Sequence, residues 1–267
     1  MPARLANILA QADRLLEPDR FQDHGPNGLQ VPRLSPAGAA GAQGEEEIST
    51  LATGVSASLE LFALAAREQA ELLVVHHGLF WGSGGGPLDV QMARRLRALF
   101  DARMALAAYH LPLDAHPELG NNALLAKALG AERLDRPFGM HRGQAIGCLA
   151  RFPGEGIPAS DLFTRAHRAT EREPLVFPAA HHPVVSTVAI VSGAGVDFLP
   201  EAAAAGAQAF LTGEPTERAM AMARELEVHF VAAGHYATET FGVRALGERL
   251  AGELGLKHVF LDVPNPI

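Results

Sequence analysis

Cysteine, long apolar runs and clustered basic residues are scarce or missing in this sequence of 267 residues. The one cysteine, Cys148, excludes an intrachain disulfide and a cysteine-rich zinc site. No apolar run approaches the roughly 18 residues of a membrane span, and no basic segment followed by an apolar one opens the chain, so we expect a cytoplasmic protein without membrane contact. The net charge is −8 and the basic residues are scattered, which argues against a broad nucleic-acid-binding face. A local basic patch that forms only on assembly of several chains is compatible with this pattern.

The order of the apolar segments predicts an α/β fold. Hydrophobic residues make up 48% of the chain, enough for a full core in one large domain or two small ones. We expect strands at residues 50–55, 72–75, 104–109, 145–152, 185–191, 209–211, 228–232 and 259–263. We expect helices at residues 3–16, 59–69, 91–100, 121–129, 160–170, 198–205, 216–226 and 235–254.

A change of character near residues 131–145, where Arg, Pro and Gly gather, marks a boundary. We therefore predict two interlinked α/β units, one formed by residues 1–135 plus 228–267 and the other by residues 136–227. Residues 33–47 are expected to form an exposed loop. The glycine-rich stretch 82–86 lacks the Lys-Ser/Thr of a phosphate-binding P-loop, so we interpret it as a flexible loop beside the site.

Side chains of the metal-binding type follow three of the expected strands. In chain order they are His76, His77, His110, Asp114, His235 and Glu239. Open α/β sheets place their chemistry at the carboxyl ends of strands, so these side chains are candidates for one site. His235 and Glu239, spaced i and i+4, would share one face of a helix that begins after Gly234.

Imidazoles and carboxylates without a thiolate favour Zn, Fe or Mn as the bound metal. A single zinc ion needs only three protein ligands plus water, fewer than the sequence offers, and a carboxylate can bridge two ions. The alternative is that each histidine merely packs at a strand end or caps a helix. His24, alone in a turn-rich stretch, is more typical of a surface or structural histidine than of a ligand.

Five short motifs resemble those of the Nif-three-like dinuclear metal-centre family, whose bacterial YbgI-type members are often labelled GTP cyclohydrolase I type 2 homologs. They are His76-His77-Gly-Leu-Phe-Trp81, His110-x-Pro-x-Asp114, Thr212-Gly213-Glu214, Gly234-His235-x-x-Thr238-Glu239 and Asn27-Gly28-Leu29-Gln30-Val31. They cover nearly the whole chain in the same order. The sequence departs from the family in two places: residues 53–58 lack an aspartate expected after the first strand, and the loop 33–47 is unusually rich in Ala and Gly.

The resemblance implies two divalent metal ions per chain. It assigns His76 and Asp114 to one ion and His77 and His235 to the other, with Glu239 as the bridge. His110 would lie close by, as a neighbour of the ligands or an occasional ligand. The resemblance also implies a toroidal homohexamer. Because the ligands come from both ends of the chain, we expect the metal site in the crevice between the two units.

Two functions of different classes fit this interpretation. The first is a metal-dependent hydrolase that acts on a nucleotide-like or phosphorylated small molecule, for which the family label suggests opening of the GTP imidazole ring. The sequence itself shows no nucleotide-binding motif. The second is a non-catalytic metal-binding ring that stores or delivers metal or interacts with a partner protein.

Overall fold

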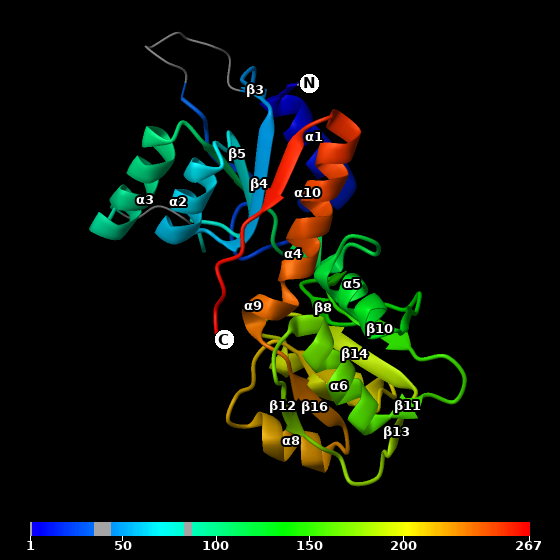
Figure 1. The fold of residues 1–267 in the computed structure, drawn as a ribbon. Helices are drawn as coiled ribbons and strands as arrows, with labels where there is room; N and C mark the ends of the chain where they lie inside the picture. Colours follow the sequence, from blue (N-terminus) through cyan, green and yellow to red (C-terminus); the bar gives the residue numbers. More distant parts are fainter. Residues whose placement is uncertain (1, 35–43, 83–86) are drawn as a thin grey trace. The chain divides into compact units, whose positions relative to one another are not determined.

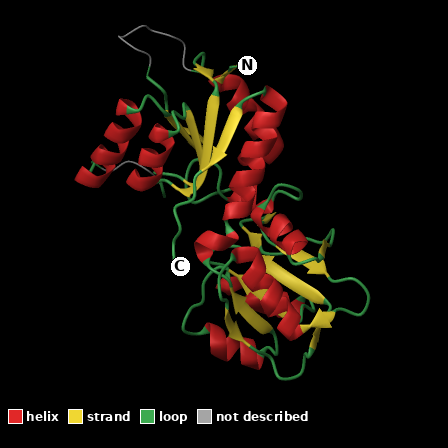
Figure 2. Ribbon diagram, viewed as in Figure 1, coloured by secondary structure: helices red, strands yellow, loops and turns green. Residues whose placement is uncertain are grey.

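The computed structural model describes residues 2–34, 44–82 and 87–267, and its chain forms two units (Figures 1 and 2). Unit 1 comprises Met1–Leu113 and Val243–Val263, and unit 2 comprises Asp114–Gly242 and Pro264–Ile267. Both units are α/β, as the sequence pattern predicts. Of the expected loops, residues 35–43 and 83–86 lie outside the described part of the chain. Among the described residues, no helix is long and apolar enough to cross a membrane.

The boundaries between the units differ from those expected at residues 135 and 228. Helix α5 (Asn121–Ala128) contributes Leu125 and Ala126 to the core of unit 2, so the segment before residue 135 packs with the second sheet. Strand β16 (His229–Ala232) pairs in parallel with β15 (Ala209–Thr212) in that same sheet. The chain therefore returns to unit 1 only within the helix that follows residue 239.

Unit 1 is built on a five-stranded sheet in the order β17-β4-β5-β6-β2. The strands are β2 (Gly28–Val31), β4 (Thr50–Ser56), β5 (Leu72–His77), β6 (Ala105–Ala108) and β17 (Lys257–Phe260). β17, β4, β5 and β6 run parallel, and β2 is antiparallel to β6. The last strand was expected at 259–263 and begins two residues earlier. A two-stranded pair, β1 (Ala3–Arg4) with β3 (Glu47–Ile48), lies outside this sheet.

Four helices cover the two faces of this sheet, with α2 and α3 on one side and α1 and α10 on the other (Figure 1). They are α1 (Leu5–Leu16), α2 (Leu59–Arg67), α3 (Val90–Asp101) and α10 (Thr240–Leu254). Side-chain caps set where two of them begin, because Ser58 Oγ accepts from the Leu61 N–H and Asp89 Oδ1 from the Met92 N–H. A turn of 3-10 helix (Pro18–Arg20) follows α1.

Helix α10 packs closely against strand β17 where Gly247 meets His258. The ring of His258 is held by a 2.9 Å hydrogen bond between its Nε2 and Thr53 Oγ1. Burial lowers the pKa of His258 and outweighs the negative charge of Glu248, which by itself would raise that pKa. A Cβ added to Gly247 would lie 2.1 Å from that Nε2. We therefore expect Gly247→Ala to lower the free energy of unfolding by about 1–3 kcal/mol.

Gly252→Ala is the matched control, because it lies on the same helix and its Cβ would meet nothing within 4 Å. Alanine has the higher helix propensity, so this variant should gain about 0.5–1 kcal/mol. Chemical denaturation of the two variants tests the pair. Equal stabilities would contradict the close packing of α10 against His258.

Unit 2 is built on a six-stranded sheet in the order β12-β16-β15-β14-β10-β7. Its strands besides β15 and β16 are β7 (Glu132–Arg133), β10 (Cys148–Arg151), β12 (Leu175–Phe177) and β14 (Thr187–Val191). β14, β15 and β16 are parallel, and the other three strands run antiparallel to their neighbours. Two small pairs complete the unit, β8 (Met140–His141) with β9 (Gln144–Ala145) and β11 (Ile157–Pro158) with β13 (Val184–Val185).

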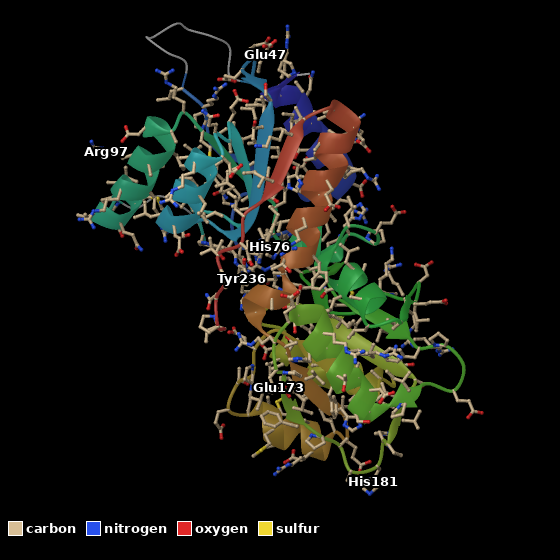
Figure 3. The ribbon with its side chains drawn as sticks, in the orientation of Figure 1. Glu47, His76, Arg97, Glu173, His181 and Tyr236 are labelled. Atoms are coloured by element: carbon tan, nitrogen blue, oxygen red, sulfur yellow. The ribbon has the colours of Figure 1, made fainter. Side chains whose placement is uncertain are left out.

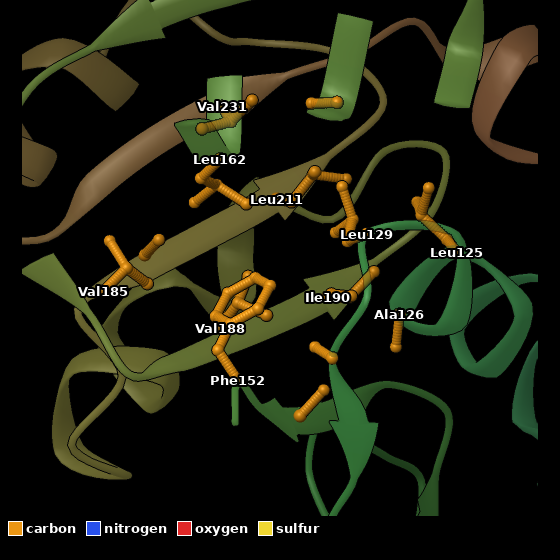
Figure 4. Close-up of a cluster of buried hydrophobic side chains, with 14 of the residues drawn as sticks. Leu125, Ala126, Leu129, Phe152, Leu162, Val185, Val188, Ile190, Leu211 and Val231 are labelled. Atoms are coloured by element: carbon orange, nitrogen blue, oxygen red, sulfur yellow. The ribbon is translucent and has the colours of Figure 1, made fainter. Parts of the chain in front are cut away.

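Both faces of the second sheet carry a hydrophobic core. Successive side chains of a strand point to opposite faces, so Val188 and Ile190 enter one cluster while Ala189 and Val191 enter the other. The first cluster is covered by α5 and α6 (Ala159–Thr170) (Figure 4). The second is covered by α7 (Leu199–Ala204) and α8 (Ala219–Glu225), with a 3-10 turn (Val196–Phe198) before α7. The sheet is therefore buried on both sides, which leaves its carboxyl-terminal edge for polar residues.

Candidate metal centre

The adjacent histidines His76 and His77 end β5, at the carboxyl edge of the parallel strands of unit 1 (Figure 3 labels His76). The strand was expected to stop at residue 75, but it includes both histidines, and His77 is in register with Ser56 of β4. Their ring centroids are nevertheless 4.8 Å apart, so the last residue of the strand turns its side chain toward the same space. His76 is fully buried and His77 is partly exposed.

His110, which follows β6, completes a group of three imidazoles. Its ring centroid lies 4.9 Å from that of His76 and 5.5 Å from that of His77. One ring nitrogen from each of the three lies within 4.8 Å of the other two, which is close enough for a common metal ion. His110 thus belongs to the histidine group directly, whereas the sequence left it as a neighbour or an occasional ligand.

Each imidazole of this group engages its Nδ1 in a hydrogen bond. The partner is the Tyr109 carbonyl oxygen for His76 at 3.0 Å, Ser56 Oγ for His77 at 2.9 Å and Asp23 Oδ1 for His110 at 2.7 Å. Carbonyl and carboxylate oxygens accept, so Nδ1 of His76 and of His110 carries the proton. Nε2 is then the nitrogen that His76 and His110 offer to a metal, an arrangement typical of metal-binding histidines.

Asp23 and Ser56 are residues of this site that the sequence did not single out. Burial by itself raises the pKa of Asp23, but the hydrogen bond and the charge of His110, with hydrogen bonds from Asn27 and His24, outweigh it and lower the pKa to about 2. A polar residue in a turn has no periodicity that could reveal a partner 87 positions away. His24 lies beside His110, with ring centroids 6.1 Å apart, but is not a member of the three-histidine group.

Asp114 lies in unit 2, at the end of the short helix α4 (Leu111–Ala115), and is buried. Its Oδ1 accepts hydrogen bonds from Asn121 Nδ2 at 2.8 Å and from Ser192 Oγ at 3.0 Å. Asn121 Oδ1 in turn accepts from the Gly242 N–H at 2.7 Å. These bonds fix the carboxylate and tie it to the segment that follows Glu239.

His235 and Glu239, also in unit 2, face one another after β16. His235 Nε2 lies 3.3 Å from Glu239 Oε1, and its Nδ1 lies 3.4 Å from Glu214 Oε1. The expected continuous helix is two helices, because α9 (His235–Thr238) ends before Glu239 and α10 begins after it. Burial would lower the pKa of His235, but the hydrogen bonds and charges of Glu239 and Glu214 outweigh it and raise that pKa. Glu214 is a further residue whose role at this place the sequence did not reveal.

Glycines at the ends of β14 and β15 make room for this group. A Cβ on Gly193 would lie 2.3 Å from Glu239 Oε1 and 3.1 Å from His235 Nε2, and a Cβ on Gly213 would lie 2.6 Å from the Cα of His235. The Thr238 hydroxyl oxygen accepts from the Gly193 N–H at 3.1 Å. The carboxyl ends of three parallel strands therefore converge on His235 and Glu239, where α/β sheets commonly bind ligands.

The five expected ligands fall into two sets. His76 and His77 lie in unit 1, and Asp114, His235 and Glu239 lie in unit 2. Within each unit, the structure brings the expected histidines and carboxylates into polar clusters whose donor atoms suit a divalent metal. The expectation that the two sets meet in a crevice between the units stays a prediction.

Fold and site together define a class, an α/β protein of two units that carries imidazole and carboxylate groups at the carboxyl edges of its parallel strands. Residues 3–266 match the model of the Duf34/NIF3 (NGG1p interacting factor 3) family, and the chain belongs to this family. A Pseudomonas aeruginosa protein called GTP cyclohydrolase 1 type 2 homolog is 38% identical over 267 residues, the full length of both chains. A Vibrio cholerae protein of the same name is 37% identical over 259 residues, 97% of each chain.

Solved structures agree with this assignment. The protein ybgI, described as of unknown function, is similar with a TM-score of 0.88 and 34% sequence identity over 99% of this chain and 100% of that one. TTHA1606 from Thermus thermophilus is similar with a TM-score of 0.84 and 35% identity, again over 99% and 100%. The resemblance inferred from the five motifs is thus confirmed.

Proposed function

We propose that this protein binds two divalent metal ions, Zn, Fe or Mn, and is a metal-dependent hydrolase of a nucleotide-like or phosphorylated small molecule. The proposal rests on the side-chain groups that could donate electron pairs to a metal. Three imidazoles in unit 1 have their Nδ1 atoms engaged, and a buried carboxylate in unit 2 faces His235. Such donors fit a hard or borderline divalent ion. The names of the relatives supply the nucleotide as a candidate substrate.

The proposed ligands are those of the family resemblance. His76 and Asp114 would hold one ion, His77 and His235 the other, and Glu239 would serve both. The hydrogen bonds from Asn121 and Ser192 orient Asp114, and Tyr109 and Ser56 orient the two histidines of β5. The chemistry that two divalent ions held by these residues would supply is polarisation of a substrate and activation of water.

The metal content of the purified protein tests the proposed metal binding directly. We expect about two ions per chain in protein purified without chelators, measured by elemental analysis. His76→Gln should lower this number, whereas the control His181→Gln should not, since His181 is exposed and paired with Glu227. A content near zero under varied metal supply would contradict the proposal.

Trp81 allows the same binding to be followed in solution. It is the only tryptophan of the chain, and its ring centroid lies 5.2 Å from that of His110 and 5.8 Å from that of His77. Titration of metal-free protein with Co²⁺ should therefore quench its fluorescence. An unchanged emission with retained metal content would place the metal away from the histidine group.

Turnover separates the hydrolase from the non-catalytic metal-binding ring. Metal-loaded protein is incubated with GTP and with other phosphorylated compounds, and products are separated by chromatography. Products that depend on His76 support the hydrolase, and opening of the GTP imidazole ring would identify the cyclohydrolase. Full metal loading without turnover of any compound favours storage, delivery or a partner protein. The toroidal homohexamer is likewise a proposal, which sedimentation of the purified protein tests.

A further inference from the structure

The turn that precedes β2 contains a buried carboxylate with an unusually complete set of donors. Asp23 Oδ1 accepts from His110 Nδ1 at 2.7 Å and from the His24 N–H at 2.6 Å. Its Oδ2 accepts from the Leu111 N–H at 2.9 Å and from Asn27 Nδ2 at 3.0 Å. Only 2% of the side chain is exposed. Each oxygen therefore accepts two hydrogen bonds, and all four donors require an acceptor.

The same turn also holds the backbone of His110. Asn27 Oδ1 accepts from the His110 N–H at 2.8 Å, so the amide of Asn27 links Asp23 to the start of the segment after β6. The residue is thus fixed at its backbone nitrogen, at its ring Nδ1 and at the N–H of the next residue. A surface ion pair would not need three such contacts on consecutive groups.

We infer that Asp23 is a positioning residue of the metal centre, which holds His110 in the Nδ1–H tautomer so that its Nε2 faces His76 and His77. This inference rests on the proposed function and extends its ligand set, since it adds Nε2 of His110 to the groups that serve the bound metal. The distances between the three rings supply the geometry, because one nitrogen of each lies within 4.8 Å of the others. Neutral imidazole has a lone pair on only one nitrogen, so the tautomer decides whether that lone pair points at the metal.

Asparagine cannot replace Asp23 in this arrangement. It has one oxygen, so two of the four donors must face its NH₂ group whichever way the amide is turned. If the NH₂ faces His110, the ring must accept on Nδ1 and carry its proton on Nε2, toward His76 and His77. If it faces Leu111, that backbone N–H and the amide of Asn27 lose their acceptor, and the segment that carries His110 shifts.

The test reads the tautomer in metal-free protein by long-range ¹H–¹⁵N correlation of the imidazole rings, with the His110 signals assigned by their loss in His110→Gln. We expect wild-type His110 to be protonated at Nδ1. In Asp23→Asn we expect the Nε2–H form or a mixture of forms, and affinity for Zn²⁺ lowered about 10–100-fold in competition with a chelator. Asp19→Asn, which removes an exposed charge from the preceding turn, should leave both unchanged.

The outcomes separate this inference from the proposed function. A wild-type His110 protonated at Nε2 overturns the inference, whatever the metal content, and this measurement needs no substitution at Asp23 and no folded variant. Unchanged Zn²⁺ affinity in folded Asp23→Asn also overturns it. A wild-type protein that binds no metal but shows the Nδ1–H tautomer overturns the proposed function, and Asp23 then only orders the turn.

Discussion

Glu239→Gln is expected to remove most of the bound metal while the protein stays folded. The substitution keeps the shape of a buried side chain but replaces a negative oxygen, 3.3 Å from His235 Nε2, with a neutral amide. If Glu239 serves both ions, both lose a ligand and the charge that balances them. The free energy of metal binding at structural zinc sites is roughly 10–16 kcal/mol, and all of the ligands of a site share in it. We therefore expect metal affinity to fall by more than about a hundredfold, at a tenfold change for roughly every 1.4 kcal/mol.

Two measurements distinguish loss of the site from loss of the fold. Metal added to the wild type should raise its Tm, because a ligand that binds the native state stabilises it. In Glu239→Gln this rise should disappear, while the Tm of the metal-free protein stays at or above that of the wild type. The control Glu217→Gln removes an exposed carboxylate from the same unit and should retain the rise. Unchanged metal content in Glu239→Gln would show that this residue is not the shared ligand.

Gly193→Ala should disrupt the same site from the backbone. Gly193 has a φ of +64°, and the Cβ of alanine would lie 2.3 Å from Glu239 Oε1. The carboxylate cannot keep its place beside His235 once this carbon is present. We expect metal affinity to fall by more than about a hundredfold, together with a loss of stability that exceeds the roughly 1–2 kcal/mol of a left-handed alanine.

The control for Gly193 separates the backbone effect from the collision. Gly206 has a φ of +81°, and its Cβ would meet nothing within 4 Å. Gly206→Ala should therefore lose stability through its backbone conformation but bind metal normally. Metal titrations and chemical denaturation of both variants give the comparison. Equal metal affinities would mean that Glu239 does not need the space beside Gly193.

The strands and the histidines at their ends could be predicted because both depend on local sequence. The apolar run 72–75 is short and buried, and the polar residues that follow it must lie at the sheet edge. The two residues His235 and Glu239 are brought together as expected, although the helix expected to align them is interrupted at Glu239.

The contacts that orient these side chains could not be predicted, because they join distant segments without a periodic pattern. Asp23 reaches His110 across 87 positions, and Glu214 meets His235 only because β15 and β16 are neighbours. The unit boundaries were placed elsewhere for a related reason. The sequence-based boundary at residue 228 assigned β16 to the first unit, whereas strand pairing, which sequence alone does not specify, puts β16 beside β15.

Because β17 pairs with β4, the sheets of the two units are completed at different stages of synthesis. All of unit 2 separates these two strands in the chain, yet they are parallel neighbours in the sheet of unit 1. The strands of the second sheet, β7 to β16, are contiguous in sequence and can pair as soon as they leave the ribosome. β4, although made much earlier, keeps an open edge until β17 emerges, and an open edge is a site for mispairing. Translation of unit 1 therefore starts before that of unit 2, but the sheet of unit 1 is completed after the sheet of unit 2.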